Sequence, residues 1–173
     1  MTIRTATVAD ADRLAAFAEL TFREAFGAMN TPEDMELHCR RSYSAAKQVE
    51  EIAATDSMTL LCEVDGMLAG YTQLRWGAEV PACVIGSAVG EIQRFYVHSS
   101  HHGTGVATAL MTAAVSHLAE RGCRNAWLSV WEQNPRAIAF YRKCGFIEVG
   151  KQIFLVGNDP QNDKVLVKVL STI

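Results

Sequence analysis

The segment EIQRFYVHSSHHGTGVA, residues 91–107, joins the end of a strand to a glycine-rich turn and the start of a helix. Residues 89–97 (VGEIQRFYV) are rich in branched and aromatic side chains, which is typical of a strand. From Val106 to Leu118 apolar residues recur at helical spacing, and Gly122 ends that helix. The first N–H groups of a helix are unpaired and lie at the positive end of its dipole. The turn is therefore a natural seat for a pyrophosphate.

The two glycines of the turn, Gly103 and Gly105, do not by themselves identify a ligand. They could equally do no more than relieve a tight connection between strand and helix. The chain has no GxxxxGK[ST] motif, and the GxGxxG pattern of dinucleotide-binding folds fails because Thr108 stands at its third glycine. A nucleotide-dependent oxidoreductase is therefore disfavoured.

The remaining chain predicts strands on both sides of this segment. A first strand at residues 2–7 precedes an amphipathic helix that we expect Asp10 to cap, and further helical stretches follow Pro32 and Ser44. The Asp65-Gly66 pair between two apolar runs is a strong hairpin signal. After the central helix come a strand at 125–131, a helix from Pro135 to about Cys144, and two final strands, IEVGKQIFLV and KVLVKVL. This order predicts an α/β protein of the α+β type, with a mixed, largely antiparallel sheet of six to seven strands and about four flanking helices.

Composition sets broad limits on the function. The 173 residues are 49% hydrophobic and 20% charged, which suits one globular domain spanning 1–173. The net charge of −3 disfavours a nucleic-acid binder. Five cysteines without a CxxC pair make a zinc ribbon or a disulfide framework unlikely. The sequence also has no evident signal peptide or membrane span, so we expect a soluble cytoplasmic protein that does not act on a membrane.

Two motifs carry a family resemblance. HGTGVA at 102–107, after a strand ending in FYV, resembles the Q/R-x-x-G-x-G/A signature of the GNAT N-acetyltransferases, with His102 where Gln or Arg is usual. NPRAIAFYRKCGF at 134–146 resembles a second motif of that family, NxxAxxxYxxxGF. A longer similarity is to bacterial spermidine/spermine N-acetyltransferases; it is carried by TFREAF (21–26), NTPEDM (30–35), EIQRFYV (91–97) and WLSVWEQNPRAIAFYRKCGF (127–146).

The resemblance implies an acetyl-CoA-dependent enzyme that acetylates a primary amine within a ternary complex, most plausibly a polyamine. An alkylamine has a pKa of about 10.4, so a base must take its proton. Glu91 matches the place of a general base in several members of the family, acting directly or through water. In a regular strand, Glu91 would share a face with Phe95 and Val97. Tyr141 matches the family's proton donor to the leaving thiolate. Glu91 could instead be a surface carboxylate, and Tyr141 could be a core residue beside Phe140.

The resemblance also implies how acetyl-CoA is held. Backbone groups of Phe95, Tyr96 and Val97 would pair with the pantetheine arm, and Asn134 and Lys143 would meet the far side of the cofactor. Lys143 could instead only complement its helix dipole. The amides that would hold the pyrophosphate belong to Gly103, Thr104, Gly105, Val106, Ala107 and Thr108, with His102 as a local hydrogen-bond donor beside them.

The three neighbouring histidines, His98, His101 and His102, invite a metal-binding interpretation. No carboxylate or cysteine lies within their loop, so we predict no metal site.

An acidic stretch offers a candidate acceptor site. Residues 10–36 contain seven acids against two arginines, a net charge of −5, which would attract a polycation. Glu24, Glu33 and Asp34 are the predicted substrate contacts. The same acids could also serve as helix caps on a solvated face.

Three alternatives remain open at this stage. The amine could belong to a protein N-terminus, to an amino acid or to an antibiotic. The chain could also bind acetyl-CoA without turnover, as a regulatory module. A homodimer is possible.

Overall fold

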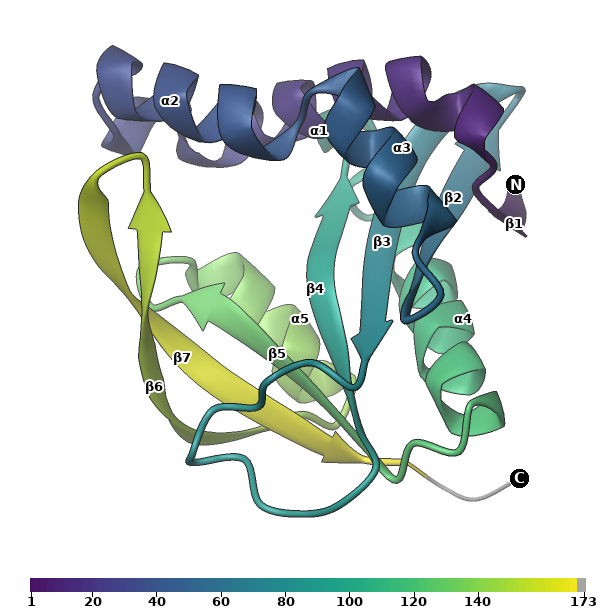
Figure 1. Cartoon of the computed structure of the whole chain (residues 1–173), viewed down its shortest axis with the longest axis vertical. Coiled ribbons are helices and arrows are strands. Elements are labelled where there is room, and N and C mark those ends of the chain that lie inside the picture. The colour runs from purple at the N-terminus through teal and green to yellow at the C-terminus, as the bar shows by residue number, and fades with distance from the viewer. Residues whose placement is uncertain (171–173) are drawn as a thin grey trace.

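The computed structural model describes residues 1–170, and the last three residues lie outside the described part of the chain. Seven strands form one sheet in the order β1-β2-β3-β4-β5-β7-β6 (Figure 1). The strands are β1 (Thr2–Thr5), β2 (Ser57–Val64), β3 (Met67–Trp76), β4 (Val89–Val97), β5 (Asn125–Trp131), β6 (Ile147–Val156) and β7 (Asp159–Val169). The helices are α1 (Ala11–Phe26), α2 (Pro32–Ser42), α3 (Ala45–Ala53), α4 (Val106–Glu120) and α5 (Pro135–Lys143).

The predicted fold class is confirmed. Every neighbouring pair of strands is antiparallel except β4 and β5, which are parallel. Residues 1–170 contain five α-helices, where about four were expected, and the two separate helical stretches predicted after Pro32 and Ser44 are α2 and α3. The Ser44 side chain accepts a hydrogen bond from the Lys47 N–H at 3.2 Å and so starts α3 anew. The Asp65-Gly66 hairpin joins β2 to β3, and both residues have positive φ (51° and 79°), as a type I′ turn requires.

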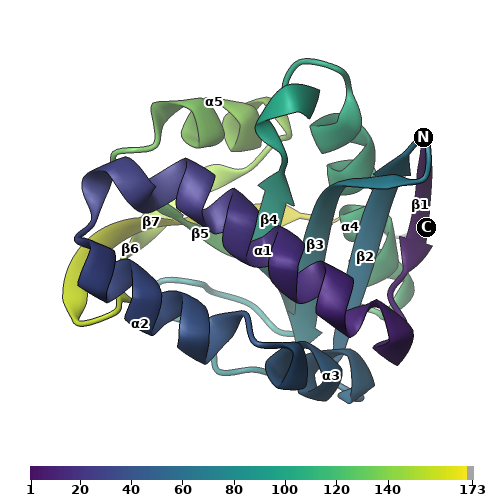
Figure 2. The same cartoon turned by 90° about the horizontal axis from the view of Figure 1, so that it is seen from above.

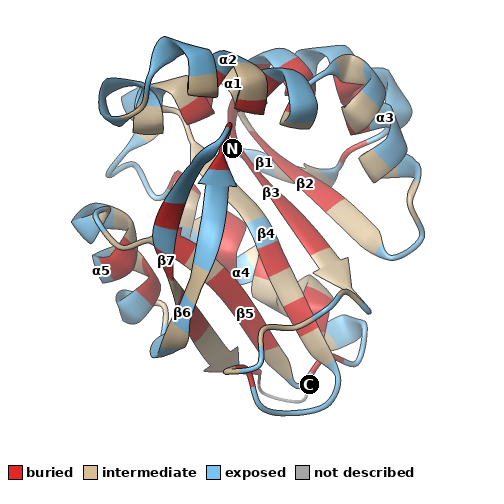
Figure 3. Cartoon of the chain, turned by 60° about the vertical axis from the view of Figure 1, so that its left-hand side comes forward, coloured by how far each residue is buried: buried red, intermediate tan, exposed pale blue. Residues whose placement is uncertain are grey.

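Helices cover both faces of the sheet. Helices α1, α2 and α3 lie along one face, and α4 and α5 lie on the other (Figure 2). Because neighbouring strand residues point to opposite faces, Leu60 belongs to the core under α4 while Leu61 belongs to the core under α1. The buried residues follow the middle of the strands (Figure 3). Among the described residues, no helix has the length and apolar character needed to cross a bilayer.

The parallel strands β4 and β5 stay together only briefly. Residues 89–91 of β4 pair with 125–127 of β5, and beyond that point the two strands diverge (Figure 1). The edge of β4 that follows Glu91 is therefore left without a strand partner, and a gap opens in the middle of the sheet.

A bulge at Gln93 changes which residues of β4 share a face. Gln73 of β3 pairs with Arg94, whereas the next residue, Leu74, pairs with Ile92. Glu91, Arg94 and Tyr96 therefore face α1 and α3, and the residues on the α4 side are Ile92, Phe95 and Val97. The prediction that Glu91 shares a face with Phe95 and Val97 is wrong, because simple alternation does not continue through a bulge.

Candidate active site

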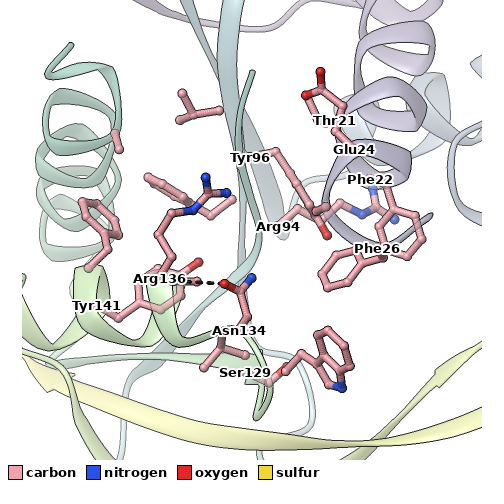
Figure 4. Close-up of a pocket in the computed structure, with 18 of the residues that line it drawn as sticks. Thr21, Phe22, Glu24, Phe26, Arg94, Tyr96, Ser129, Asn134, Arg136 and Tyr141 are labelled. Carbon is pink, nitrogen blue, oxygen red and sulfur yellow. Dashed lines mark hydrogen bonds between the residues drawn. The ribbon is translucent and has the colours of Figure 1, made fainter. Parts of the chain in front are cut away.

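A cavity of about 430 Å³ lies where β4 and β5 separate. The part of β4 after Glu91 forms its floor, α5 and the glycine turn form one side, and α1 with the β6–β7 hairpin forms the other. Figure 4 shows Tyr141 and Arg136 on the α5 side and Phe22, Glu24 and Phe26 on the α1 side, with Arg94 and Tyr96 between them. The sheet thus brings together residues that are far apart in the chain.

The glycine turn leads directly into α4. Gly103 and Gly105 both have positive φ (80° and 92°), and Gly105 is the left-handed residue immediately before the helix. Gly103 and Ala107 line the cavity, and the other predicted members of the turn, Thr104, Gly105, Val106 and Thr108, do not. The first free N–H groups of α4 therefore lie next to the cavity.

His102 links this turn to α5. Arg136 donates a hydrogen bond to Nδ1 of His102 at 2.8 Å, so the other ring nitrogen carries the proton that is donated to the Val97 carbonyl, at 3.0 Å. His98 points elsewhere, with Nε2 3.5 Å from the Glu24 carboxylate. Within residues 1–170, no three His, Cys, Asp or Glu side chains form a group that could hold a metal ion.

Helix α5 contributes Asn134 and Tyr141. Asn134 caps the helix, its side chain accepting the Ala137 N–H at 3.1 Å. Tyr141 is only 8% exposed and packs against the rings of Phe95, Phe140 and Phe146, with centroids 5.6 to 6.1 Å away. Burial raises the pKa of Tyr141 well above 10. Its phenol is therefore protonated at neutral pH and can donate a proton or a hydrogen bond into the cavity.

Glu91 is half-buried and is not among the residues that line the cavity. Its carboxylate lies 3.7 Å from the Arg75 guanidinium, and burial raises its pKa. It shares the α1 and α3 face of the sheet with Arg94 and Tyr96. Its predicted role as a base would accordingly need a water molecule to carry the proton.

The predicted acceptor residues are not brought together. Glu24 lines the cavity and accepts a hydrogen bond from Ser99 Oγ at 3.0 Å. Asp34 lies outside the cavity and accepts the Asn158 N–H at 2.9 Å, holding the turn between β6 and β7 against α2. Glu33 is exposed on α2, and Lys143 is exposed on α5, and both also lie outside the cavity.

Most of the acids between residues 10 and 36 have structural partners. The prediction that the Asp10 side chain caps α1 is wrong. Asp10 stands at the N-cap position without a side-chain hydrogen bond to the helix, and its carboxylate is paired with Arg4, at 2.6 Å. Arg23 binds both Glu19 and Glu36. Most carboxylates of this stretch are therefore bonded within the fold, although the segment keeps a net negative charge.

The sequence did not point to a pair of bonded polar residues in the cavity, Asp163 and Ser129. Asp163 on β7 lines the cavity, is 6% exposed, and accepts a hydrogen bond from Ser129 Oγ of β5 at 2.8 Å. Burial raises the pKa of Asp163 to about 6. Strand alternation could have indicated Asp163 as a site residue. Alternate residues of β7 are buried, and the Asp163 carboxylate lies on the buried side with Gln161 and Val165.

An aromatic wall faces the two carboxylates of the cavity. Phe22 and Phe26 of α1 lie 4.8 Å apart between ring centroids, and Phe26 meets Trp131 of β5 at 5.9 Å. Tyr96 and Phe154 extend this wall along β4 and β6. Apolar and aromatic walls with a few convergent polar groups are typical of sites for small organic molecules.

Comparisons with known proteins show the family of this chain. The model of the acetyltransferase (GNAT) family matches residues 11–146. The chain belongs to this family. This acetyltransferase is 33% identical to an "Uncharacterized N-acetyltransferase" of Mycobacterium bovis over 161 residues, which cover 93% of this chain and 98% of the relative.

A solved structure resembles the whole fold, and several relatives match part of the chain. The crystal structure of the PaiA N-acetyltransferase from Thermoplasma acidophilum in complex with coenzyme A covers 98% of this acetyltransferase and 99% of the other chain, with a TM-score of 0.77 at 21% identity. A "Probable spermine N(1)-acetyltransferase" of Bacillus subtilis subsp. natto is 32% identical over 80 residues, 46% of this chain and 49% of the relative. Other partial relatives are named for mycothiol and for an aminoglycoside.

Proposed function

We propose that this acetyltransferase transfers the acetyl group of acetyl-CoA to a primary amine, and that the amine is a polyamine. The observation that carries the proposal is the cavity between β4 and β5. It extends from the glycine turn, past Tyr141, to the carboxylates of Glu24 and Asp163. One opening thus offers an anion site, a proton donor and two groups that attract a cation.

The donor side of the cavity suits acetyl-CoA. The edge of β4 at Phe95, Tyr96 and Val97 has no pairing with β5. Apart from the Val97 carbonyl, which is bonded to His102, the backbone groups on this edge can bond an extended arm such as pantetheine. The N–H groups at the start of α4 suit the pyrophosphate. When bound, acetyl-CoA supplies a thioester carbonyl that an amine can attack. Tyr141 is the residue proposed to protonate or stabilise the leaving sulfur.

Gly105→Ala tests the donor side. Alanine strains the positive φ and displaces the adjacent amides, so the dissociation constant of CoA is expected to rise at least about fivefold, which is about 1 kcal/mol. Titration calorimetry with CoA measures this. Gly77→Ala is a matched control, since Gly77 also has a positive φ (78°) with open space around its Cα but lies in the loop between β3 and β4. Equal CoA affinity for the two variants would contradict the assignment of the turn.

The acceptor side suits a slender cation. Aromatic faces attract both methylene chains and ammonium groups, and two carboxylates line the same space. A polyamine offers both features along one chain. Because the acids of residues 10–36 are mostly paired, the support for a polyamine comes from the cavity rather than from long-range charge attraction.

A panel of amines tests the proposed function. Release of CoA thiol would be followed with spermidine, spermine, an aminoglycoside, free amino acids and a peptide with a free N-terminus. We expect the highest kcat/KM for spermidine or spermine. Turnover of another amine without turnover of either polyamine would contradict the polyamine assignment. No turnover with any amine, despite CoA binding, would contradict the enzymatic proposal and favour a regulatory module.

A further inference from the structure

We propose that Asp163, held by Ser129, binds the amino group of the acceptor and takes its proton during acetyl transfer. This inference rests on the proposed function and deepens it, because it names the residue that meets the amine. Asp163 would contact the amine directly inside the cavity, whereas Glu91 would need a water molecule to carry the proton.

The position of Asp163 supports this role. The residue is 94% buried, yet it lines the cavity where β4 and β5 separate. Ser129 Oγ donates to Oδ2, and no residue in 1–170 donates to Oδ1. In the same part of the chain, Tyr71 has the only side-chain oxygen or nitrogen that is both enclosed and unpaired. The free Oδ1 of Asp163 therefore still reaches the space of the cavity, where an N–H donor can bind it.

The charges around Asp163 leave it without a cation. Its nearest lysines along and across the sheet bind elsewhere, Lys164 to Glu148 and Lys151 to Glu132. Tyr96 of β4 and Glu132 after β5 also act on it, and neither carries a positive charge. Two arginines line the same cavity, but Arg94 is paired with Glu51 and Arg136 is bonded to His102, and neither forms an ion pair with Asp163. A buried carboxylate without a positive partner is costly, and an ammonium ion in the cavity would supply one.

Glu91 is less well placed for the same task. Arg75 already lies 3.7 Å from its carboxylate, and Glu91 does not line the cavity. Asp163 needs no intervening water, because its free oxygen opens into the space that the aromatic wall encloses. Their positions therefore favour Asp163 over Glu91 as the residue that meets the amine directly.

The chemistry balances with the groups present. The ammonium form of the acceptor first binds Asp163 and gives up one proton to water, which leaves the Asp163 carboxylate ionised. The nitrogen lone pair then forms a bond to the thioester carbonyl carbon, the C–S bond breaks, and the sulfur takes a proton from Tyr141. The second proton of the new amide nitrogen passes to the Asp163 carboxylate. Asp163 and Tyr141 then return to their starting forms by exchange with water.

Asp163→Asn tests the inference through the pH profile. Asp163 must be ionised to act, and its pKa is raised to about 6, so kcat/KM of the wild type should rise with pH through about 6. In the variant we expect this limb to vanish, kcat/KM at pH 7 to fall about 100-fold or more, and part of the rate to return at alkaline pH, where more amine is unprotonated.

Two controls separate a catalytic role from a structural one. Asp65→Asn makes the same chemical change at the exposed turn between β2 and β3 and should leave the profile unchanged. Because burial raises the pKa of Asp163 above its unfolded value, ionisation of Asp163 weakens folding as the pH rises toward 6. The Tm of Asp163→Asn at pH 7 should therefore equal or exceed that of the wild type, and CoA affinity should change less than about twofold.

Glu91→Gln completes the experiment. A limb near pH 6 that survives in Asp163→Asn but vanishes in Glu91→Gln would overturn the inference. An unchanged kcat/KM in Asp163→Asn would also overturn it, as would a lower Tm that accounts for the lost rate. These outcomes leave the proposed function standing, since they require an active wild type; inactivity of the wild type on every amine is the separate outcome that removes the function itself.

Discussion

Tyr141→Phe is expected to lower kcat at least about 100-fold while changing the dissociation constant of acetyl-CoA less than about twofold. The substitution removes one hydroxyl and keeps the ring that packs against Phe95, Phe140 and Phe146. Folding should therefore be preserved, and only the proton donor to the leaving sulfur is lost. Steady-state kinetics and CoA titration calorimetry measure the two quantities.

Tyr71→Phe is the matched control for this prediction. Tyr71 undergoes the same chemical change, but its enclosed hydroxyl has no hydrogen-bond partner in the described chain and does not line the cavity. Its loss should leave kcat unchanged and should not reduce Tm, because an unpaired buried hydroxyl is unfavourable. If Tyr141→Phe retained the wild-type kcat, Tyr141 would be a core residue and not the proton donor.

The second large effect concerns stability. The buried guanidinium of Arg94 binds Glu51 through both terminal nitrogens, at 2.6 and 3.1 Å, and donates to Gln73 at 2.7 Å. Both side chains of the ion pair are only 12 to 13% exposed. Glu51→Ala leaves the arginine charge buried without its partner. The free energy of unfolding is expected to fall by about 3 to 5 kcal/mol.

Thermal and urea unfolding would measure this loss, which corresponds to a fall in Tm of about 10 °C for a chain of this size. Glu50→Ala is the control, because Glu50 pairs with Lys47 at the surface and should contribute less than about 1 kcal/mol. A double variant, Glu51→Leu with Arg94→Leu, should lose less than the two single changes together, since neither leaves a lone charge. A loss below about 1 kcal/mol for Glu51→Ala would show that water reaches Arg94.

Local patterns predicted the elements of the fold well. Alternation and helical spacing depend on nearest neighbours, so the hairpin at Asp65 and the turn at Gly103 could be read from the sequence. The bulge at Gln93 could not, because it depends on how β4 pairs with β3. It moves Glu91 to the other face of the sheet and so changes what its carboxylate can reach.

Contacts between distant segments limited the prediction of the site. Asp10 was predicted to cap a helix and Asp34 to contact the substrate, but Arg4 and the turn at Asn158 occupy their carboxylates. No local pattern in the sequence marks Asp163. Its carboxylate becomes part of the cavity only because β7 pairs with β5 beside the gap between β4 and β5. A sequence states which side chains are charged, whereas the packing decides which charges remain free.

The β6–β7 hairpin has a consequence for how acceptor preference can change over evolution. Its turn fits closely against α2, since a Cβ on Gly157 would lie 2.6 Å from the Cα of Asp34. The hairpin carries Phe154 and Asp163 into the cavity, and it follows the region, residues 11–146, that the family model matches. Substitutions on this hairpin can therefore alter part of the acceptor side without touching the glycine turn or Tyr141.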